Sequence, residues 1–397
     1  MQHSFTRDRF TWMAYLVLAL YGYFLNVIGP ITPFLKDELG LSYTVSSLHY
    51  TAFAIGIILV GLGGDVAIQR FGRWRSLWIG AGGLSLGALL LVTGRSPWIT
   101  ITAAFLMGLV GSLILAIIPS ALSDRHGEQR AIALTEANMI ASVAATIAPL
   151  LVGFFARTIF GWRVALLGMA LMPLLMYVIF RGTSLHETKQ ASPDQPDEAK
   201  KPLPGRFWAL WWALVLGVAV EFCMISWSAD YLEKALGMLK ADAAQSVSLF
   251  LGAMIVGRLV ISRLTQRVST LNLVSTSILV AGGGFLLFWL GGSVATGLVG
   301  LFLTGLGVAG LYPLILALAI GAAGSQTVQA GSRATLASGT AILTLPLVLG
   351  RLADAFSIQQ AYGVVGLLLV GAFVIIRAAR RPQDPSDTSP VHSRANS

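Results

Sequence analysis

Several ionisable residues interrupt long apolar runs in this sequence. A charge in such a run costs about 2.5–3.5 kcal/mol on insertion scales if the run lies in lipid. Each charge must therefore pair with an opposite charge, face an aqueous cavity or serve a transported ion. The candidates are Asp65, Glu136, Glu221, Arg258, Arg333, Arg351, Asp354 and His49.

Glu221 is the acidic residue that the sequence places deepest. It follows about 14 residues of an apolar run, which corresponds to roughly 21 Å of helix. Removal from water favours the neutral form of a carboxyl, so its proton affinity would respond to solute binding or to gating. This is the chemistry of a proton-coupled site. The alternative is a structural carboxyl that is permanently protonated or hydrogen-bonded.

Three of the other candidates have local explanations. Arg351 and Asp354 are three residues apart, so they can pair with each other on one helix face. His49 falls near the outer end of its run, where a solvated histidine is expected in preference to a pH sensor.

Aromatic and amide side chains in three of the runs are suited to a polar ligand. Such groups stack on a small molecule and hydrogen-bond to it. The predicted ligand contacts are Tyr21, Tyr23 and Asn26 in the first run, Trp227 in the seventh and Tyr312 in the tenth.

The composition indicates that these residues are carried by membrane-spanning helices. Hydrophobic residues make up 55% of the chain and charged residues 11%, less than half the charged share of a soluble domain. Twelve runs reach the roughly 20 residues that a spanning helix needs. They lie near 11–34, 45–68, 76–94, 98–122, 131–156, 162–180, 207–231, 244–264, 271–291, 294–321, 334–356 and 360–379.

The runs fall into two sets of six, which predicts an all-α membrane protein of two six-helix bundles. The bundles are expected at 1–180 and 207–380. A polar, proline-containing stretch at 181–206 reads as a cytoplasmic linker, and 381–397 as a disordered cytoplasmic tail.

Basic residues are confined mostly to the gaps between runs. With the N-terminus inside, 19 of the 27 Lys and Arg residues fall on the cytoplasmic side and 6 on the other. This asymmetry predicts cytoplasmic termini in a cell membrane, and it explains the net charge of +9 without nucleic acid. The single cysteine, Cys223, excludes an internal disulfide and argues against a cysteine-ligated metal.

The two sets of runs resemble each other at one ungapped offset of 197 residues. Phe105–Leu109 falls on Phe302–Leu306, Gln69-Arg70 on Gln266-Arg267, and Pro149-Leu150 with Gly153 on Pro346-Leu347 with Gly350. Parallel half-repeats place a solute site at their interface, near the bilayer midplane.

The sequence resembles the major facilitator superfamily. Twelve runs, a linker after the sixth and a glycine-acid-basic loop after the second carry the resemblance; the loop comprises Gly61, Asp65, Arg70, Gly72, Arg73 and Arg75. Four residues separate its acid from its first arginine, whereas the family pattern has them adjacent. Drug antiporters carry a glycine-proline element in the fifth span. Here only Ala148-Pro149 and Gly153 of that element remain, and its doubled glycine is absent. The sequence also resembles fucose-permease-type sugar carriers, though more weakly. The residues that carry this second resemblance are Glu221, Trp227, Tyr231, Gly305, Gly307, Gly310 and Tyr312-Pro313.

The resemblance implies an inner gate. In the superfamily fold the second span faces the eleventh, and the fifth faces the eighth. Asp65 is therefore expected to pair with Arg333, and Glu136 with Arg258, when the cytoplasmic side is closed; Arg70 and Arg73 of the loop belong to the same gate. The alternative is that each charge reaches the interface without a partner.

These patterns favour a secondary transporter that moves a small polar organic solute by alternating access, with the proton as coupling ion through Glu221 or Glu136. The alternatives are an exporter of amphipathic drug-like compounds and an organic-anion uniporter or exchanger. An enzyme is disfavoured because nucleotide-binding glycine loops, HExxH and GxSxG are missing. No cofactor, metal or nucleic acid is expected, and a monomer in the lipid bilayer is the predicted form.

Overall fold

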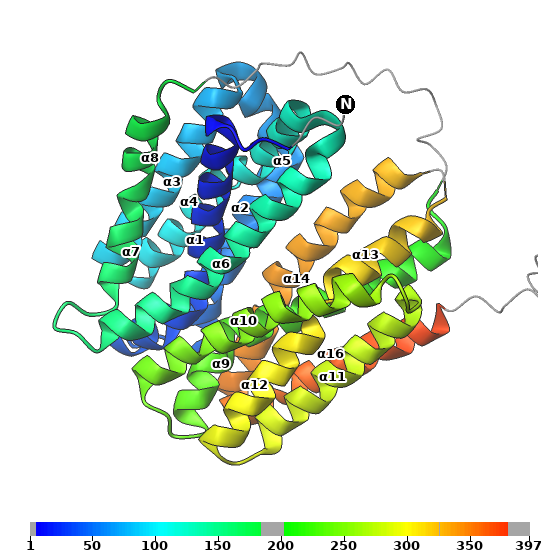
Figure 1. The fold of residues 1–397 in the computed structure, drawn as a ribbon. Helices are drawn as coiled ribbons and strands as arrows, with labels where there is room; N and C mark the ends of the chain where they lie inside the picture. The colour runs from blue at the N-terminus through cyan, green and yellow to red at the C-terminus, as the bar shows by residue number, and fades with distance from the viewer. Residues whose placement is uncertain (1–4, 184–201, 325, 380–397) are drawn as a thin grey trace, which may run out of the picture.

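The structure, a computed structural model, describes residues 5–183, 202–324 and 326–379 (Figure 1). The tail predicted at 381–397 and most of the predicted linker lie outside these ranges. The first half contains α1 (Arg9–Leu39), α2 (Tyr43–Phe71), α3 (Arg73–Thr93), α4 (Pro97–Gly111), α5 (Leu113–His126), α6 (Arg130–Ala156), α7 (Arg163–Ala170) and α8 (Met172–Phe180). The second half contains α9 (Gly205–Lys234), α10 (Lys240–Leu264), α11 (Thr270–Leu290), α12 (Val294–Val308), α13 (Leu311–Ala322), α14 (Thr327–Ala355), α15 (Ile358–Ala361) and α16 (Gly363–Ala378).

Eleven helical stretches of the described chain are long and apolar enough to cross a membrane. One of them, Pro97–Ala156, has 60 residues and contains α4, α5 and α6. Its chain turns back at a short 3-10 segment, Gly127–Gln129, where Gly127 adopts φ 52. Because α5 and α6 then pack against each other, this stretch crosses twice. The predicted all-helical fold with twelve crossings is confirmed.

The two halves repeat each other in the positions of their helices. Counterpart helices begin 197 residues apart: α2 and α10, α3 and α11, α4 and α12, and α6 and α14. This is the offset at which the sequence motifs match, so the repeat in sequence is also a repeat in structure. The two bundles lie side by side in Figure 1.

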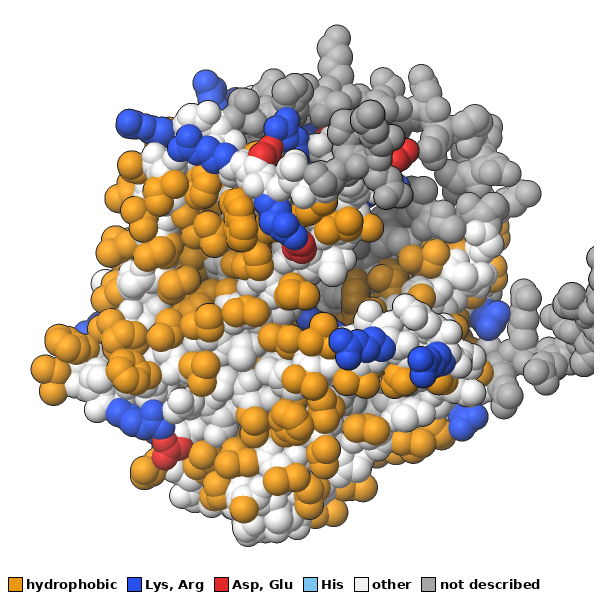
Figure 2. Space-filling model, viewed as in Figure 1, with side chains coloured by type: hydrophobic (Ala, Val, Ile, Leu, Met, Phe, Trp, Pro, Cys, Tyr) orange, Lys and Arg blue, Asp and Glu red, His pale blue; other side chains and the backbone are white. Residues whose placement is uncertain are grey.

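The outer surface of the molecule is apolar, as expected for a protein that lipid surrounds. Figure 2 shows hydrophobic side chains spread over the visible face, with Lys and Arg in a few separate groups among them. Individual residues are strongly exposed, among them Leu62 at 72% and Leu367 at 72%. In water such a surface would aggregate, whereas in a bilayer it meets acyl chains.

Four helix pairs of the described residues join the halves: α1 with α9, α1 with α10, α2 with α14, and α6 with α10. All the spans begin or end at one of two ends of the molecule. We call the end where α1 begins and α16 stops the terminal end, and the other the far end. The repeated glycines Gly153 and Gly350 lie at equivalent far-end contacts, since a Cβ on either would stand 2.6 Å from Ala241 O and 2.8 Å from Tyr43 O respectively.

Among the described glycines, Gly29 would bring a Cβ closest to the opposite half, and its replacement is our first prediction. A Cβ at Gly29 would lie 2.1 Å from the carbonyl oxygen of Ile225 on α9. Gly29→Ala should therefore destabilise this arrangement by about 1–3 kcal/mol, the usual cost of overpacking. The gain in helix propensity is the same in every state of α1, so it cannot offset the clash.

Distances between spin labels on the two halves test this prediction. We expect Gly29→Ala to shift the distribution toward a state with the far end opened. Gly168→Ala is the matched control, because a Cβ there meets nothing within 4 Å. An unchanged distribution in Gly29→Ala would show that α1 and α9 separate by less than this contact requires.

Candidate solute site and gates

A cavity of about 150 Å³ lies between the two halves. Helices α1 and α6 of the first half and α9 and α10 of the second form its walls. The lining residues are Gly22, Asn26, Asn138, Ala141, Ser142, Ala145, Glu221, Leu251, Met254 and Arg258. The structure therefore brings together three residues that the sequence singled out, Asn26, Glu221 and Arg258.

The polar side chains of this cavity are only partly used by the protein itself. Arg258 Nη1 donates to Ser142 Oγ at 3.0 Å, across the two halves. Ser142 Oγ donates to the carbonyl oxygen of Asn138 at 2.8 Å. Within the described part of the chain, no hydrogen bond is formed by the carboxyl of Glu221, and Arg258 is the charged group that acts on it through space. The cavity thus holds an acid and a base that are free to meet a solute.

A second cavity, of about 370 Å³, lies between α6 and α10. It shares Asn138, Ser142 and Arg258 with the first, so the two are adjoining parts of one space. Apolar side chains dominate its other walls, and its residues reach toward the start of α6 and the end of α10. The remaining lining residues are Leu134, Thr135, Met139, Ile255, Leu259 and Ser262. The space therefore extends from Glu221 toward the terminal end.

A buried ion pair closes the far end. Lys36 of α1 donates to Asp230 of α9, and their side chains are 7% and 0% exposed. The Lys36 ammonium also lies 3.7 Å from the centroid of the Tyr43 ring, whose other neighbour is the ring of Trp227 at 5.5 Å. A desolvated pair of this kind links α1, α2 and α9 strongly only while both partners are present.

Sequence reasoning missed this pair. It ended the first span near residue 34, whereas α1 continues to Leu39 and stops at Gly40, whose φ is 61. The extra turn carries Lys36 into the molecule. Asp230, an acid near the end of an apolar run, was a signal that could have been used.

Partly exposed pairs surround the buried one. Asp37 pairs with Lys240, and Arg157 with Asp242. The carboxyl of Asp354 accepts from the backbone N–H groups of Tyr43 and Thr44, at 2.8 Å each. The predicted pairing of Asp354 with Arg351 is therefore wrong: the free N–H groups at the start of α2 compete for the carboxylate.

The predicted inner-gate pairs are not formed in this state. Glu136 accepts from Arg7 at 2.5 Å and from Tyr15 at 3.1 Å. Asp65 and Arg333 are both exposed. Since the halves meet at the far end, the terminal-end pairs are expected to be apart here, and their closure in the opposite state stays a prediction.

We predict that closure of the terminal end brings Glu136 to Arg258 and Asp65 to Arg333. Each N···O distance should fall within about 4 Å, the reach of a salt bridge. A structure of the state open at the far end measures this directly. Separations much larger than salt-bridge reach in that state would remove these four residues from the gate.

Most of the predicted aromatic ligands lie elsewhere in this structure. Tyr21 OH contacts Ser112 Oγ at 3.3 Å, Tyr23 OH donates to Ala165 O at 2.9 Å, and Trp227 Nε1 donates to Pro346 O at 3.1 Å. All three are buried in helix packing, away from the cavity lining. Tyr312 is half-buried on α13.

His49 is buried rather than solvated. Its side chain is 2% exposed and contacts Ser46 O and Thr100 Oγ1, both at 2.9 Å. The expectation of a solvated histidine is wrong because α4 packs against this part of α2 and places Thr100 beside the ring.

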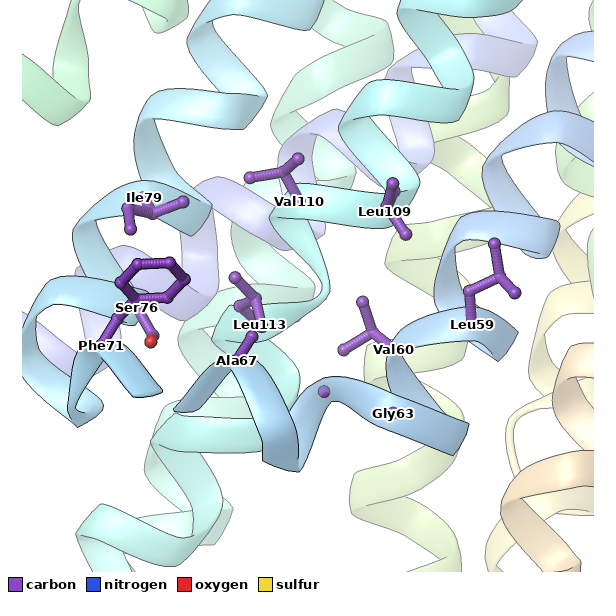
Figure 3. Close-up of a pocket in the computed structure, with 11 residues that line it drawn as sticks. Leu59, Val60, Gly63, Ala67, Phe71, Ser76, Ile79, Leu109, Val110 and Leu113 are labelled. Atoms are coloured by element: carbon purple, nitrogen blue, oxygen red, sulfur yellow. The ribbon is translucent and has the colours of Figure 1, made fainter. Parts of the chain in front are cut away.

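The loop after α2 stays within the first half. Arg73 pairs with Asp124 of α5 at 2.5 Å, and Arg70 lies over the Phe71 ring at 5.8 Å. Beside it is a mainly apolar pocket of about 300 Å³ (Figure 3), which α2 to α5 line with residues such as Val60, Phe71 and Leu113. All its lining residues belong to the first half, and none of them lines the charged cavity.

No group of His, Cys, Asp or Glu side chains suited to a metal ion occurs in the described residues.

Just before α1, the carboxyl of Asp8 accepts hydrogen bonds from Thr11 and Arg125. Partial burial would raise the pKa of Asp8, but these hydrogen bonds outweigh it and the pKa is lowered.

Comparison with known proteins decides the family. Residues 14–332 match the Major Facilitator Superfamily. The chain belongs to this superfamily. It is a multi-pass membrane transporter and not an enzyme, in agreement with the sequence-based predictions.

Relatives within the superfamily agree over nearly the full length. An uncharacterized MFS-type transporter of Yersinia pestis is 24% identical over 365 residues, covering 89% of this chain and 91% of the relative. A solved bacterial homolog of the human lysosomal transporter Spinster, in an inward-facing and occupied conformation, superimposes with a TM-score of 0.78 at 15% identity, covering 95% of this chain and 97% of that one.

The fucose:proton symporter of E. coli is also similar in structure. Its TM-score is 0.62 at 16% identity, with 94% of this chain and 100% of that chain covered. At such identities the likeness concerns the fold of the superfamily and leaves the solute to be argued from the site.

Proposed function

We propose that this superfamily member is a secondary active transporter that moves a small polar organic solute by alternating access, coupled to protons through Glu221. The observation that carries the proposal is the cavity between the halves, in which an unpaired carboxyl and a guanidinium face the same space. A carboxyl surrounded by protein binds or releases its proton according to what lies beside it.

The described state is inward-facing in this proposal, with both termini in the cytoplasm. Lys36 and Asp230 seal the extracellular side, and the space lined by α6 and α10 leads to the cytoplasm. In the outward-facing state the buried pair separates. Arg258 then leaves Ser142 and pairs with Glu136, so the same guanidinium serves the site in one state and the gate in the other.

An exporter of amphipathic compounds is the second candidate. The wider cavity favours it, since Leu134, Met139, Ile255 and Leu259 line that part of the space. An apolar body would pack there while a polar group reached Arg258.

Transport by purified protein in liposomes distinguishes the candidates. Labelled sugars, amino acids, carboxylates and an amphipathic cation are supplied outside, with and without an inwardly directed proton gradient. We expect one polar class to accumulate above its external concentration only with the gradient, and a protonophore to abolish accumulation. Movement of the amphipathic cation alone would support the exporter.

A further inference from the structure

The amide side chains beside Glu221 present acceptors to the cavity. Asn26 Nδ2 donates to Gly22 O at 2.9 Å, and Asn138 Nδ2 donates to Leu134 O at 2.8 Å. In both cases the amide nitrogen is engaged by its own helix. The amide oxygens accept no hydrogen bond from the described residues. Together with the Glu221 carboxyl they form a wall that suits a donor of several hydrogen bonds.

Arg258 supplies the opposite chemistry. One of its N–H groups donates to Ser142, while a guanidinium carries five N–H donors in all. The others are available to an anion, and a carboxylate matches their planar fork. The cavity therefore has an acceptor-rich, acidic part and a basic part.

The size and chemistry of the cavity restrict the ligand further. The part of the space beside Glu221 has a volume of about 150 Å³, so the polar end of the ligand must be compact, while the adjoining part of about 370 Å³ leaves room for a side chain. A ligand with an ammonium and a carboxylate offers hydrogen-bond donors to the acceptor-rich part and an anion to the exposed guanidinium of Arg258. A sugar would satisfy the hydrogen bonds but would supply no anion for Arg258.

We infer that the solute is a small zwitterion with a protonated primary amine and a carboxylate, of the amino-acid type. Its ammonium donates to the oxygens of Asn26 and Asn138 and to the carbonyl oxygen of the Glu221 carboxyl, which still accepts when the carboxyl is protonated. Its carboxylate binds Arg258. This assignment rests on the proposed function, because it treats the cavity as the solute site of a transporter.

Ligand-induced stabilisation of the purified full-length protein tests the inference. The probes are glycine, L-alanine and β-alanine at millimolar concentration, beside alaninamide, which lacks the carboxylate, propionate, which lacks the amine, and glycine betaine, which lacks N–H groups. Fucose and an amphipathic cation complete the panel. We expect at least one primary-amine zwitterion to raise the unfolding temperature, since a ligand that binds only the folded form stabilises it.

The single-charge analogues and glycine betaine should bind about 10- to 100-fold more weakly, the effect of losing a charge-assisted hydrogen bond. Arg258→Gln should weaken zwitterion binding by a similar factor, whereas Glu221→Gln keeps an acceptor oxygen and should retain binding. Glu128→Gln and Arg263→Gln, which remove an exposed acid and an exposed base, should leave it unchanged.

Three results would overturn the inference. Stabilisation by fucose with none by the zwitterions would leave the proposed function intact and change the solute class. Stabilisation by the amphipathic cation alone would contradict the inference and the proposed function together. Absence of any zwitterion effect, in protein whose unfolding is cooperative, would also reject the zwitterion.

Discussion

Replacement of Glu221 by glutamine is expected to abolish accumulation driven by a pH gradient while solute exchange across the membrane continues. The amide keeps the size of the side chain and its ability to hydrogen-bond, but it cannot take up or release a proton. A transporter that moves one proton with each solute concentrates the solute about tenfold for each pH unit of gradient. Glu221→Gln should reduce that ratio to one.

The measurement compares net uptake with counterflow in the same liposomes. Counterflow depends on binding and on the alternation of the halves, and it needs no proton gradient. Glu128→Gln, on an exposed turn, is the control for loss of an acid. If Glu221→Gln concentrates solute like the wild type, Glu221 is a structural residue and Glu136 becomes the coupling candidate.

Removal of either partner of the Lys36–Asp230 pair is expected to have the largest effect on conformation. Breaking a buried pair from one side costs about 3–5 kcal/mol, because the remaining charge stays in a low-dielectric site. The Asp230 side chain is fully buried, and its Oδ2 has no hydrogen-bond partner among the described residues. Opening of the far end would return that charge to water.

Lys36→Met should therefore shift the protein toward the state open at the far end, as reported by distances between labels on α1 and α9. The double variant Lys36→Met with Asp230→Leu should behave more like the wild type, since it leaves no unpaired charge. Lys240→Met removes a partly exposed pair with Asp37 at the same end and should change the balance by at most about 1 kcal/mol. Equal effects of Lys36→Met and Lys240→Met would contradict the role of the buried pair.

Much of the fold could be predicted because its determinants are long apolar runs. The runs gave the twelve crossings, and the 197-residue offset gave the correspondence of the halves. The depth of Glu221 and of Arg258 within their runs was also readable, since each residue adds a fixed rise along a helix. The structure places these two residues in one cavity.

The direction in which a side chain points could not be predicted. A helix that is apolar all round gives no sign of which face meets the other half. Tyr23 and Trp227 were expected at the solute pathway, yet both are buried within helix packing and bond to backbone carbonyls. Asn138 and Ser142 attracted no attention, because a single polar residue in a run carries little signal until its neighbours across the interface are known.

Helix ends were the other source of error. Lys36 and His49 lie near the ends of the predicted spans, where the sequence suggests contact with water. Both helices continue beyond the apolar runs. Helix α1 ends only at Gly40, and α2 begins directly after Ser42, whose side chain caps it. The added turn of α1 carries Lys36 into the molecule, and His49 is covered by α4, which packs against the start of α2.

Proton movement during solute entry tests the central proposal most directly. Liposomes that contain the protein and an entrapped pH indicator are given external solute without any initial pH gradient. Our account predicts acidification of the interior that depends on the solute, is absent in protein-free liposomes and is lost in Glu221→Gln. Entry of the solute with no change in internal pH would contradict proton coupling through Glu221.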